Sequence, residues 1–98
     1  MYENIVLADN KEAKRFEIEV ENQTAFIDYI VAQDKIFLTH TEVPKALGGK
    51  GIGRQLVELV LGQIEESGVK LVPMCPFVAA YIRKHPEKKS LMAEGFNV

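Results

Sequence analysis

Four glycines fall within six residues near the middle of this chain, in the segment Gly48-Gly49-Lys50-Gly51-Ile52-Gly53. The preceding residues, 36–43, are rich in β-branched and aromatic side chains, which predicts a strand. The following residues have apolar side chains at intervals of three and four positions, which predicts an amphipathic helix from Gly51 to Glu66. The glycines therefore form a tight turn between a strand and a helix, and the rest of the fold must accommodate it.

This glycine turn has the properties of a phosphate-binding loop. Glycine permits positive φ and close approach of the backbone to a ligand. The free N–H groups and the dipole of the first helical turn favour an anion. Arg54-Gln55 follows Gly53, so the Lys-Ser/Thr of a Walker P-loop is missing, and Arg54 and Leu56 replace the third glycine of a dinucleotide fingerprint. A glycine-rich helix cap without a ligand is the alternative.

Composition indicates which classes of protein the chain can and cannot belong to. The 98 residues are 47% hydrophobic, which predicts one globular domain over residues 1–98. The formal net charge of -2 does not indicate a nucleic-acid-binding surface. No apolar run approaches the ~20 residues of a membrane span, and the first residues do not resemble a signal peptide. The single cysteine cannot form an internal disulfide, so we expect a cytoplasmic protein.

Strand patterns lie on both sides of the glycine turn. Residues 15–20 and 24–31 alternate apolar and polar side chains, with a hairpin turn at 21–23, and residues 36–43 continue this antiparallel meander. Residues 69–74 form a short strand after the helix, and a β-α-β crossover makes this strand parallel to the strand before the turn. A short apolar segment, residues 5–8, precedes the meander.

The C-terminal third predicts short helices. The apolar residues Phe77, Ala80 and Tyr81 indicate a second helix that is interrupted at His85-Pro86, and residues 90–96 indicate a last helical turn. The predicted fold class is therefore α/β (or α+β): a mixed sheet with an antiparallel N-terminal meander, a central β-α-β crossover and short C-terminal helices.

Cys75 and His40 are the two candidates for catalysis. Pro76 suits the first turn of a helix, which makes Cys75 its N-cap, where the helix dipole favours the thiolate. A lone cysteine is also often a small buried apolar residue.

Strict alternation puts His40 and Glu42 on the face of the strand that carries Ile36 and Leu38. There His40 is either a buried, hydrogen-bonded histidine or a proton acceptor in a cleft, and a buried Glu42 could serve as acceptor instead.

A metal site is not expected. His40, Cys75 and His85 lack the paired spacing of zinc ligands, so we predict no metal.

Three segments follow one another in the chain: His40-Thr41-Glu42-Val43-Pro44, Gly51-x-Gly53-Arg54-Gln55-Leu56-Val57 and Val72-Pro73-x-Cys75-Pro76-Phe77-Val78-x-x-Tyr81-Ile82-x-x-His85-Pro86. In this order they resemble the minimal, roughly hundred-residue members of the GNAT superfamily, the acetyl-CoA-dependent N-acetyltransferases. The resemblance extends from about Phe16 to Pro86, although Gly48 replaces the long polar residue that begins the usual pyrophosphate loop of the family.

This resemblance implies roles for particular residues. The backbone amides of the glycine turn would hold the pyrophosphate of CoA, and the pantetheine arm would lie between the two parallel strands. His40 and Cys75 would face the acyl thioester, with transfer either direct or through a transient acetyl-Cys75. The implied cofactor-binding residues are Thr41, Glu42, Val43, Gly48, Gly49, Lys50, Gly51, Ile52, Gly53 and Arg54.

The resemblance thus implies an N-acetyltransferase that moves the acetyl group of acetyl-CoA to an amine. The helices that separate the first strands in larger GNAT enzymes are absent here, so the acceptor site should be open, which suits a protein or peptide lysine. An acyl-CoA-binding module without efficient catalysis and a small interaction domain are the alternatives.

Arg83-Lys84-His85 and Lys88-Lys89 form either a solvated basic face or a site for the 3′-phosphate of CoA. The oligomeric state stays open, and a monomer is compatible with the sequence.

Overall fold

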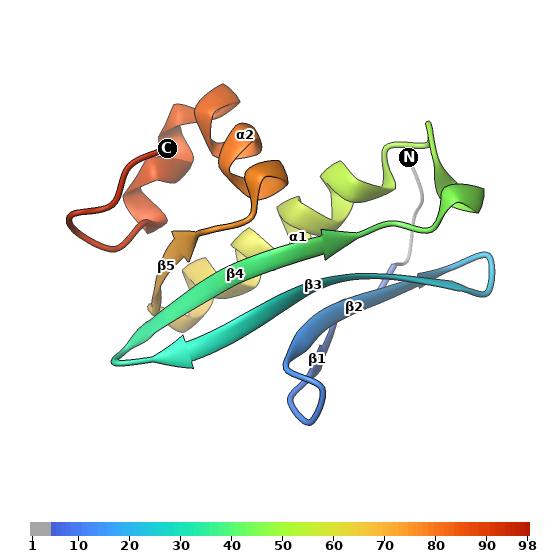
Figure 1. The fold of residues 1–98 in the computed structure, drawn as a ribbon, viewed down its shortest axis with the longest axis horizontal. Helices are drawn as coiled ribbons and strands as arrows, with labels where there is room; N and C mark the ends of the chain where they lie inside the picture. Colours follow the sequence, from blue (N-terminus) through green and yellow to red (C-terminus); the bar gives the residue numbers. More distant parts are fainter. Residues whose placement is uncertain (1–4) are drawn as a thin grey trace.

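The computed structural model describes residues 5–98, which form a five-stranded sheet with helices (Figure 1). The strands lie side by side in the order in which they occur in the chain. Their bounds are β1 (Ala8–Asn10), β2 (Arg15–Val20), β3 (Gln23–Ala32), β4 (Lys35–Glu42) and β5 (Lys70–Pro73). The helices are α1 (Ile52–Ser67) and α2 (Pro76–Lys84), with the 3-10 helices η1 (Lys45–Leu47) and η2 (Pro86–Leu91).

The mixed direction of the sheet is confirmed. The strands β1 to β4 pair antiparallel, whereas β4 and β5 pair parallel, from Lys35 opposite Lys70 to Leu38 opposite Pro73. The β2–β3 and β3–β4 turns each contain two residues with positive φ, Glu21-Asn22 and Gln33-Asp34. Such turns match the twist of paired strands and so close tight hairpins.

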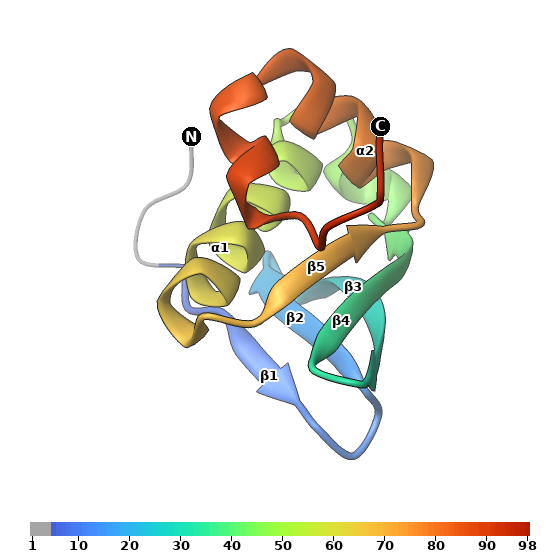
Figure 2. The ribbon, with the colours of Figure 1, turned by 90° about the vertical axis from the view of Figure 1, so that its left-hand side faces the viewer.

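The crossover helix α1 packs along one face of the sheet (Figure 2). It begins one residue after Gly51 and ends before Gly68, and both glycines have left-handed backbone angles. The Gly68 N–H donates to the carbonyl oxygens of Ile64 and Glu65, so the predicted helix end is confirmed. The core between helix and sheet consists of apolar side chains at every second strand position and on one stripe of α1. Its largest members include Ile18, Ile27, Leu38, Ile52, Leu56, Val57, Val60, Leu61 and Leu71.

The C-terminal segment differs from the prediction of a helical turn at residues 90–96. The 3-10 helix η2 occupies residues 86–91 instead, where Pro86 begins the turn. Met92 then has extended backbone angles and forms a parallel bridge with Leu71, and the Ala93 N–H donates to the Leu71 carbonyl oxygen at 2.8 Å. These bonds hold residues 92–93 against the outer edge of β5, and therefore the helix cannot continue there.

No helix within residues 5–98 is both long and apolar enough to cross a bilayer.

Candidate functional site

The parallel strands β4 and β5 separate at the end where the glycine turn and α2 lie. Their last pair is Leu38 with Pro73, after which the Cys75 N–H donates to the Leu38 carbonyl oxygen at 2.8 Å. The strand β4 continues for four more residues, to Glu42, while the chain after β5 turns into α2. Within the described part of the chain, β5 therefore offers no strand partner to residues 39–42 of β4.

A β-bulge lies where the two strands begin to separate. Tyr29 pairs with Leu38 but Asp28 pairs with His40, so Thr39 is an extra residue on β4. The Thr39 hydroxyl donates to the Asp28 carbonyl oxygen at 3.3 Å. An extra residue shifts the alternation of side chains by one position. After the bulge, Thr41 takes the core-facing side, opposite Ile27, and His40 takes the outer side.

The bulge makes the predicted shared face of Ile36, Leu38, His40 and Glu42 wrong. Leu38 is fully buried, whereas the side chains of His40 and Glu42 are each 57% exposed. The His40 Nε2 lies 2.9 Å from the Glu42 Oε1, and the His40 ring lies 6.5 Å from the ring of Phe26 on the outer face of the sheet. His40 is therefore not the buried histidine that strict alternation suggested, and neither is Glu42 a buried carboxyl group.

Cys75 occupies the predicted N-cap of α2, with Pro76 at the first helical turn. Its thiol is buried, with 4% of the residue exposed, and shares a hydrogen bond with the Thr41 hydroxyl, the two atoms being 3.2 Å apart. The contact joins the end of β4 to the start of α2 on the core side. Cys75 and His40 thus lie on opposite sides of the separated end of β4.

The glycine turn leaves the start of α1 open. Gly49 and Gly51 have φ of 75° and 74°, and a Cβ atom at either position would meet no atom of the described residues within 4 Å. No side chain of residues 5–98 caps α1, and its first α-helical bond runs from the Gln55 N–H to the Gly51 carbonyl oxygen. The N–H groups of Ile52, Gly53 and Arg54 therefore have no carbonyl partner within the helix.

Gly53 is required for a different reason. A Cβ atom there would lie 2.8 Å from Cζ of Phe77 and 3.4 Å from a methyl group of Val43. The absence of a side chain lets the first turn of α1 lie against α2 and the end of β4 at once. Lys50, next to these glycines, forms an ion pair with Glu21 at 3.1 Å, which ties the turn to the β2–β3 hairpin.

A cavity of about 450 Å³ lies beside the first turn of α1. Basic side chains from both helices, Arg54, Lys84 and His85, line it together with Phe77, Ala80 and Tyr81. Arg54 and Tyr81 donate hydrogen bonds to the same carboxylate oxygen of Glu58, at 3.3 and 3.1 Å. Burial, reinforced by Glu58, raises the pKa of Tyr81, so the phenol stays neutral at physiological pH.

The sequence interpretation missed Tyr81 as a site residue. The ring of His85 stacks on it at 4.1 Å, and the Nδ1–H of His85 donates to the Tyr81 carbonyl oxygen at 2.9 Å. The spacing of Phe77, Tyr81 and Lys84 at intervals of four and three residues marks one face of α2 and could have indicated this group. Two members of the predicted basic patch, Lys84 and His85, therefore line a cavity next to the glycine turn.

Comparison with known proteins agrees with this architecture. A sequence model of the GCN5-related N-acetyl-transferase family matches residues 15–91. The solution structure of a GCN5-like protein from Staphylococcus aureus superposes with a TM-score of 0.68 at 26% identity, over 94% of this chain and 91% of that one. The overall fold is thus shared with a GCN5-like protein of similar extent.

Curated relatives match over shorter stretches. Protein NATD1 of Xenopus tropicalis is 30% identical over 56 residues, which are 57% of this chain and 51% of that protein. Human protein NATD1 is 35% identical over 49 residues, which are 50% of this chain and 43% of that protein. The matches thus span about half the length of these relatives.

Because the family model covers most of the chain, from the first residue of β2 to the last residue of η2, this protein belongs to the GCN5-related N-acetyltransferase family.

Proposed function

We propose that this protein transfers the acetyl group of acetyl-CoA to an amine, with a lysine of a protein or peptide as the acceptor. The observation that carries the proposal is the separated end of β4 and β5 with an uncapped glycine turn beside it, in a chain of the GCN5-related family. Bound acetyl-CoA would supply an acetyl group activated as a thioester.

The glycine turn fits a pyrophosphate. The amides of residues 52–54 point out of an uncapped helix start, and the positive end of the helix dipole adds to their attraction for an anion. The glycines leave space for a phosphate group. No atom of the described residues lies within 4 Å of where a Cβ of Gly49 or Gly51 would be, and glycine has no side chain to fill that space. Arg54 and Lys84 provide cationic groups beside the turn for further phosphate charge, and the ring of His85 lies in the same cavity.

The end of β4 fits the extended arm of the cofactor. No strand formed by residues 5–98 pairs with residues 39–42 on the side of β5, so their backbone groups are available to an extended chain with amide groups. Backbone hydrogen bonds of this kind support affinity in other cases of strand addition. Thr41, Glu42 and Val43 would therefore orient the arm.

His40 would act as the base. Its Nε2–H donates to Glu42, which leaves Nδ1 as the basic nitrogen that would accept a proton from the incoming ammonium group. Backbone N–H groups near Val43 would stabilise negative charge on the carbonyl oxygen. Cys75 and Thr41 lie on the other side of β4 and would line the thioester end of the site.

The acceptor side is open. The strand β2 passes directly into β3 through Glu21-Asn22, so no helix between them walls off His40. An exposed base on the outer face of a sheet suits a side chain that projects from a large partner better than a small enclosed metabolite.

Calorimetric titration with acetyl-CoA tests the cofactor site. Gly51→Glu puts a carboxylate and a strained backbone into the turn, and we expect it to abolish binding. Gly51→Ala carries the same strain without the charge and should lose less affinity. Gly62→Glu adds the same charge on α1, where a Cβ meets nothing, and should bind as the wild type does. Unchanged binding by Gly51→Glu, or no binding by the folded wild type, would refute the proposal.

The second candidate function is binding of acyl-CoA without turnover. The buried Cys75 thiol, already hydrogen-bonded to Thr41, favours it, because a binding module needs no accessible nucleophile. Acetylation of a lysine peptide at a rate that falls in His40→Gln, while acetyl-CoA affinity is unchanged, would support the transferase and exclude the module.

A further inference from the structure

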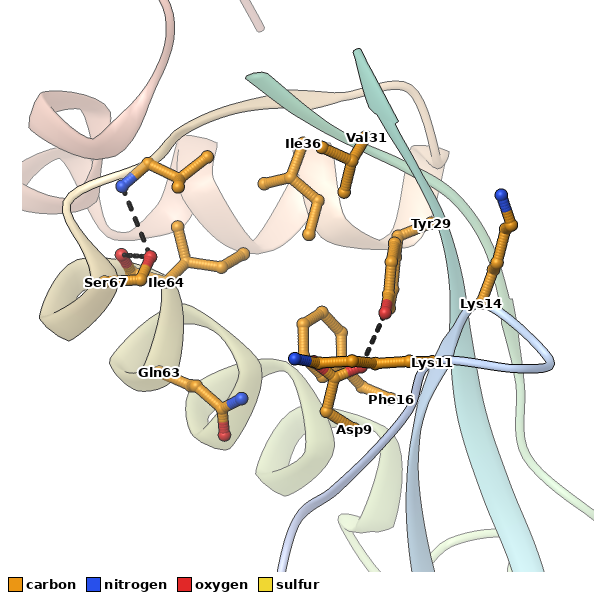
Figure 3. A pocket seen from close by; sticks show the side chains of 11 residues that line it. Asp9, Lys11, Lys14, Phe16, Tyr29, Val31, Ile36, Gln63, Ile64 and Ser67 are labelled. Carbon is orange, nitrogen blue, oxygen red and sulfur yellow. Dashed lines mark hydrogen bonds between the residues drawn. The ribbon is translucent and has the colours of Figure 1, made fainter. Parts of the chain in front are cut away.

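A second cavity, of about 390 Å³, opens at the opposite end of α1 (Figure 3). Its walls come from the core-facing sides of β2, β3 and β4 and from the last turns of α1. The helix of 16 residues separates this opening from the glycine turn by ~24 Å. The cavity therefore belongs to a different part of the molecule from the site described above.

The floor of the cavity is apolar. Phe16, Tyr29, Ile36 and Ile64 form it, and each is at most 8% exposed. The rings of Phe16 and Tyr29 lie 4.8 Å apart at an angle of 40°. Val31, which is 62% exposed, continues the apolar surface to the mouth. A space of this size with aromatic and aliphatic walls falls in the range of small-molecule sites.

The polar groups at the mouth are not equivalent. The carboxylate of Asp9 accepts a short hydrogen bond, 2.6 Å, from the Tyr29 hydroxyl. Lys11 and Lys14 line the same mouth and form no ion pair within residues 5–98. Figure 3 shows the Lys11 side chain extended from the β1–β2 turn in the direction of α1. The acidic group is thus already engaged, while the two ammonium groups are available.

We propose that this cavity binds a hydrophobic monocarboxylic acid, whose apolar body lies against Phe16, Tyr29 and Ile64 and whose carboxylate pairs with Lys11. An amphipathic cation would meet two lysines with the Asp9 carboxylate already occupied. A neutral apolar molecule would leave the Lys11 ammonium without a partner at the mouth. A carboxylate forms a charge-assisted hydrogen bond with Lys11 and places the rest of the ligand in the apolar space.

Octanoate is the probe for this proposal, because its chain is flexible and apolar and it carries one carboxylate. Titration of the full chain, followed by amide chemical shifts, should give saturable changes around Phe16, Tyr29 and Ile64. Octylammonium has the same chain with the opposite charge and should give much weaker changes. Absence of saturation up to about 10 mM octanoate, or equal binding of the two probes, would overturn the proposal.

Two kinds of variant test separately the contribution of the Lys11 charge and that of the open cavity to octanoate binding. Lys11→Glu should weaken octanoate binding about tenfold or more, since it replaces an attractive charge by a repulsive one. Lys89→Glu makes the same change on η2 and should have no effect. Gln63→Trp fills the mouth from α1 and should also abolish binding, whereas Glu65→Trp, on the same helix outside the cavity, should not. Octanoate binding that survives both Lys11→Glu and Gln63→Trp would contradict this site.

The site does not depend on the proposed transferase function. Gly51→Glu should abolish acetyl-CoA binding and leave the octanoate titration unchanged, and Lys11→Glu should weaken octanoate binding and leave acetyl-CoA binding unchanged. A folded wild type that binds octanoate but not acetyl-CoA would therefore refute the proposed function without affecting this inference.

Discussion

The two halves of β4 differ in residue types and in tasks, since residues 35–38 are mostly apolar and residues 39–42 are polar. From Lys35 to Leu38 the strand is paired on both sides, with β3 and with β5, and Leu38 is fully buried. From Thr39 to Glu42 it is paired, among the described strands, with β3 alone, and its side chains reach both the core side and solvent. One extra residue, Thr39, and the early end of β5 at Pro73 separate the two halves. A sheet can thus provide a rigid core and an open ligand-binding edge within one strand.

The paired half should dominate stability, and Leu38→Ala should have the largest effect. Removal of a fully buried leucine side chain leaves a cavity between the sheet and α1, which costs about 2–5 kcal/mol. Urea unfolding followed by circular dichroism measures the change. A decrease of less than about 1 kcal/mol in the free energy of unfolding would mean that the core relaxes around this position. The two halves of β4 would then differ little in their contribution to stability.

Tyr29, which pairs with Leu38 at the bulge, should make stability depend on alkaline pH. Burial and the hydrogen bond to Asp9 raise its pKa to about 12, above the value of 10.0 for an unperturbed tyrosine. Because the unfolded chain loses this proton first, the stabilisation is present below pH 10 and disappears as pH rises toward 12. The difference between the two pKa values corresponds to about 2–3 kcal/mol of the free energy of unfolding.

Comparison with Tyr29→Phe isolates this effect from other titrating groups. At neutral pH the variant should be less stable than the wild type by about 1 kcal/mol, because the hydrogen bond to Asp9 is lost. The difference should shrink and then reverse between pH 10 and 12, as measured by urea unfolding at several pH values. A difference that is constant over this range would contradict the assigned pKa.

Thr41→Val in the separated half should have the smallest effect on stability. The substitution keeps the shape and removes the hydroxyl that bonds to the Cys75 thiol, at a cost of about 0.5–1.5 kcal/mol. Reaction of Cys75 with a thiol reagent in the native protein should become faster, because the thiol loses its partner. A stability loss as large as that of Leu38→Ala would show that the open half also supports the core.

Most of the fold could be predicted from local patterns. Alternation over residues 15–31 and the glycines on either side of α1 defined the hairpin and the helix to within one residue of its observed bounds. These features depend on side-chain periodicity and on backbone angles that glycine accepts readily, and both are visible in a sequence. The mixed direction of the sheet followed from the crossover rule.

The faces on which the side chains of residues 39–42 lie could not be predicted, because no residue type marks the bulge in β4. Thr39 is an ordinary strand residue, and its role depends on the pairing of Asp28 and Tyr29 with β4. The faces assigned to His40 and Glu42 were consequently wrong. Cys75 was correctly placed at a helix start because Pro76 is a local signal, whereas its contact with Thr41 depends on the bulge. The group around Tyr81 needed the packing of α1 against α2, which also lies beyond local patterns.

The edges of the sheet bear on how readily this chain could add strands from other molecules. Long unpaired strand edges recruit strands from other molecules and promote aggregation. Here β1 spans three residues, and the outer edge of β5 bonds with residues 92–93. The free edge of residues 39–42 lies beside the start of α2, where Thr41 contacts Cys75. The proposed extended ligand would use this edge, whereas β1 and β5 offer other chains little template for strand addition.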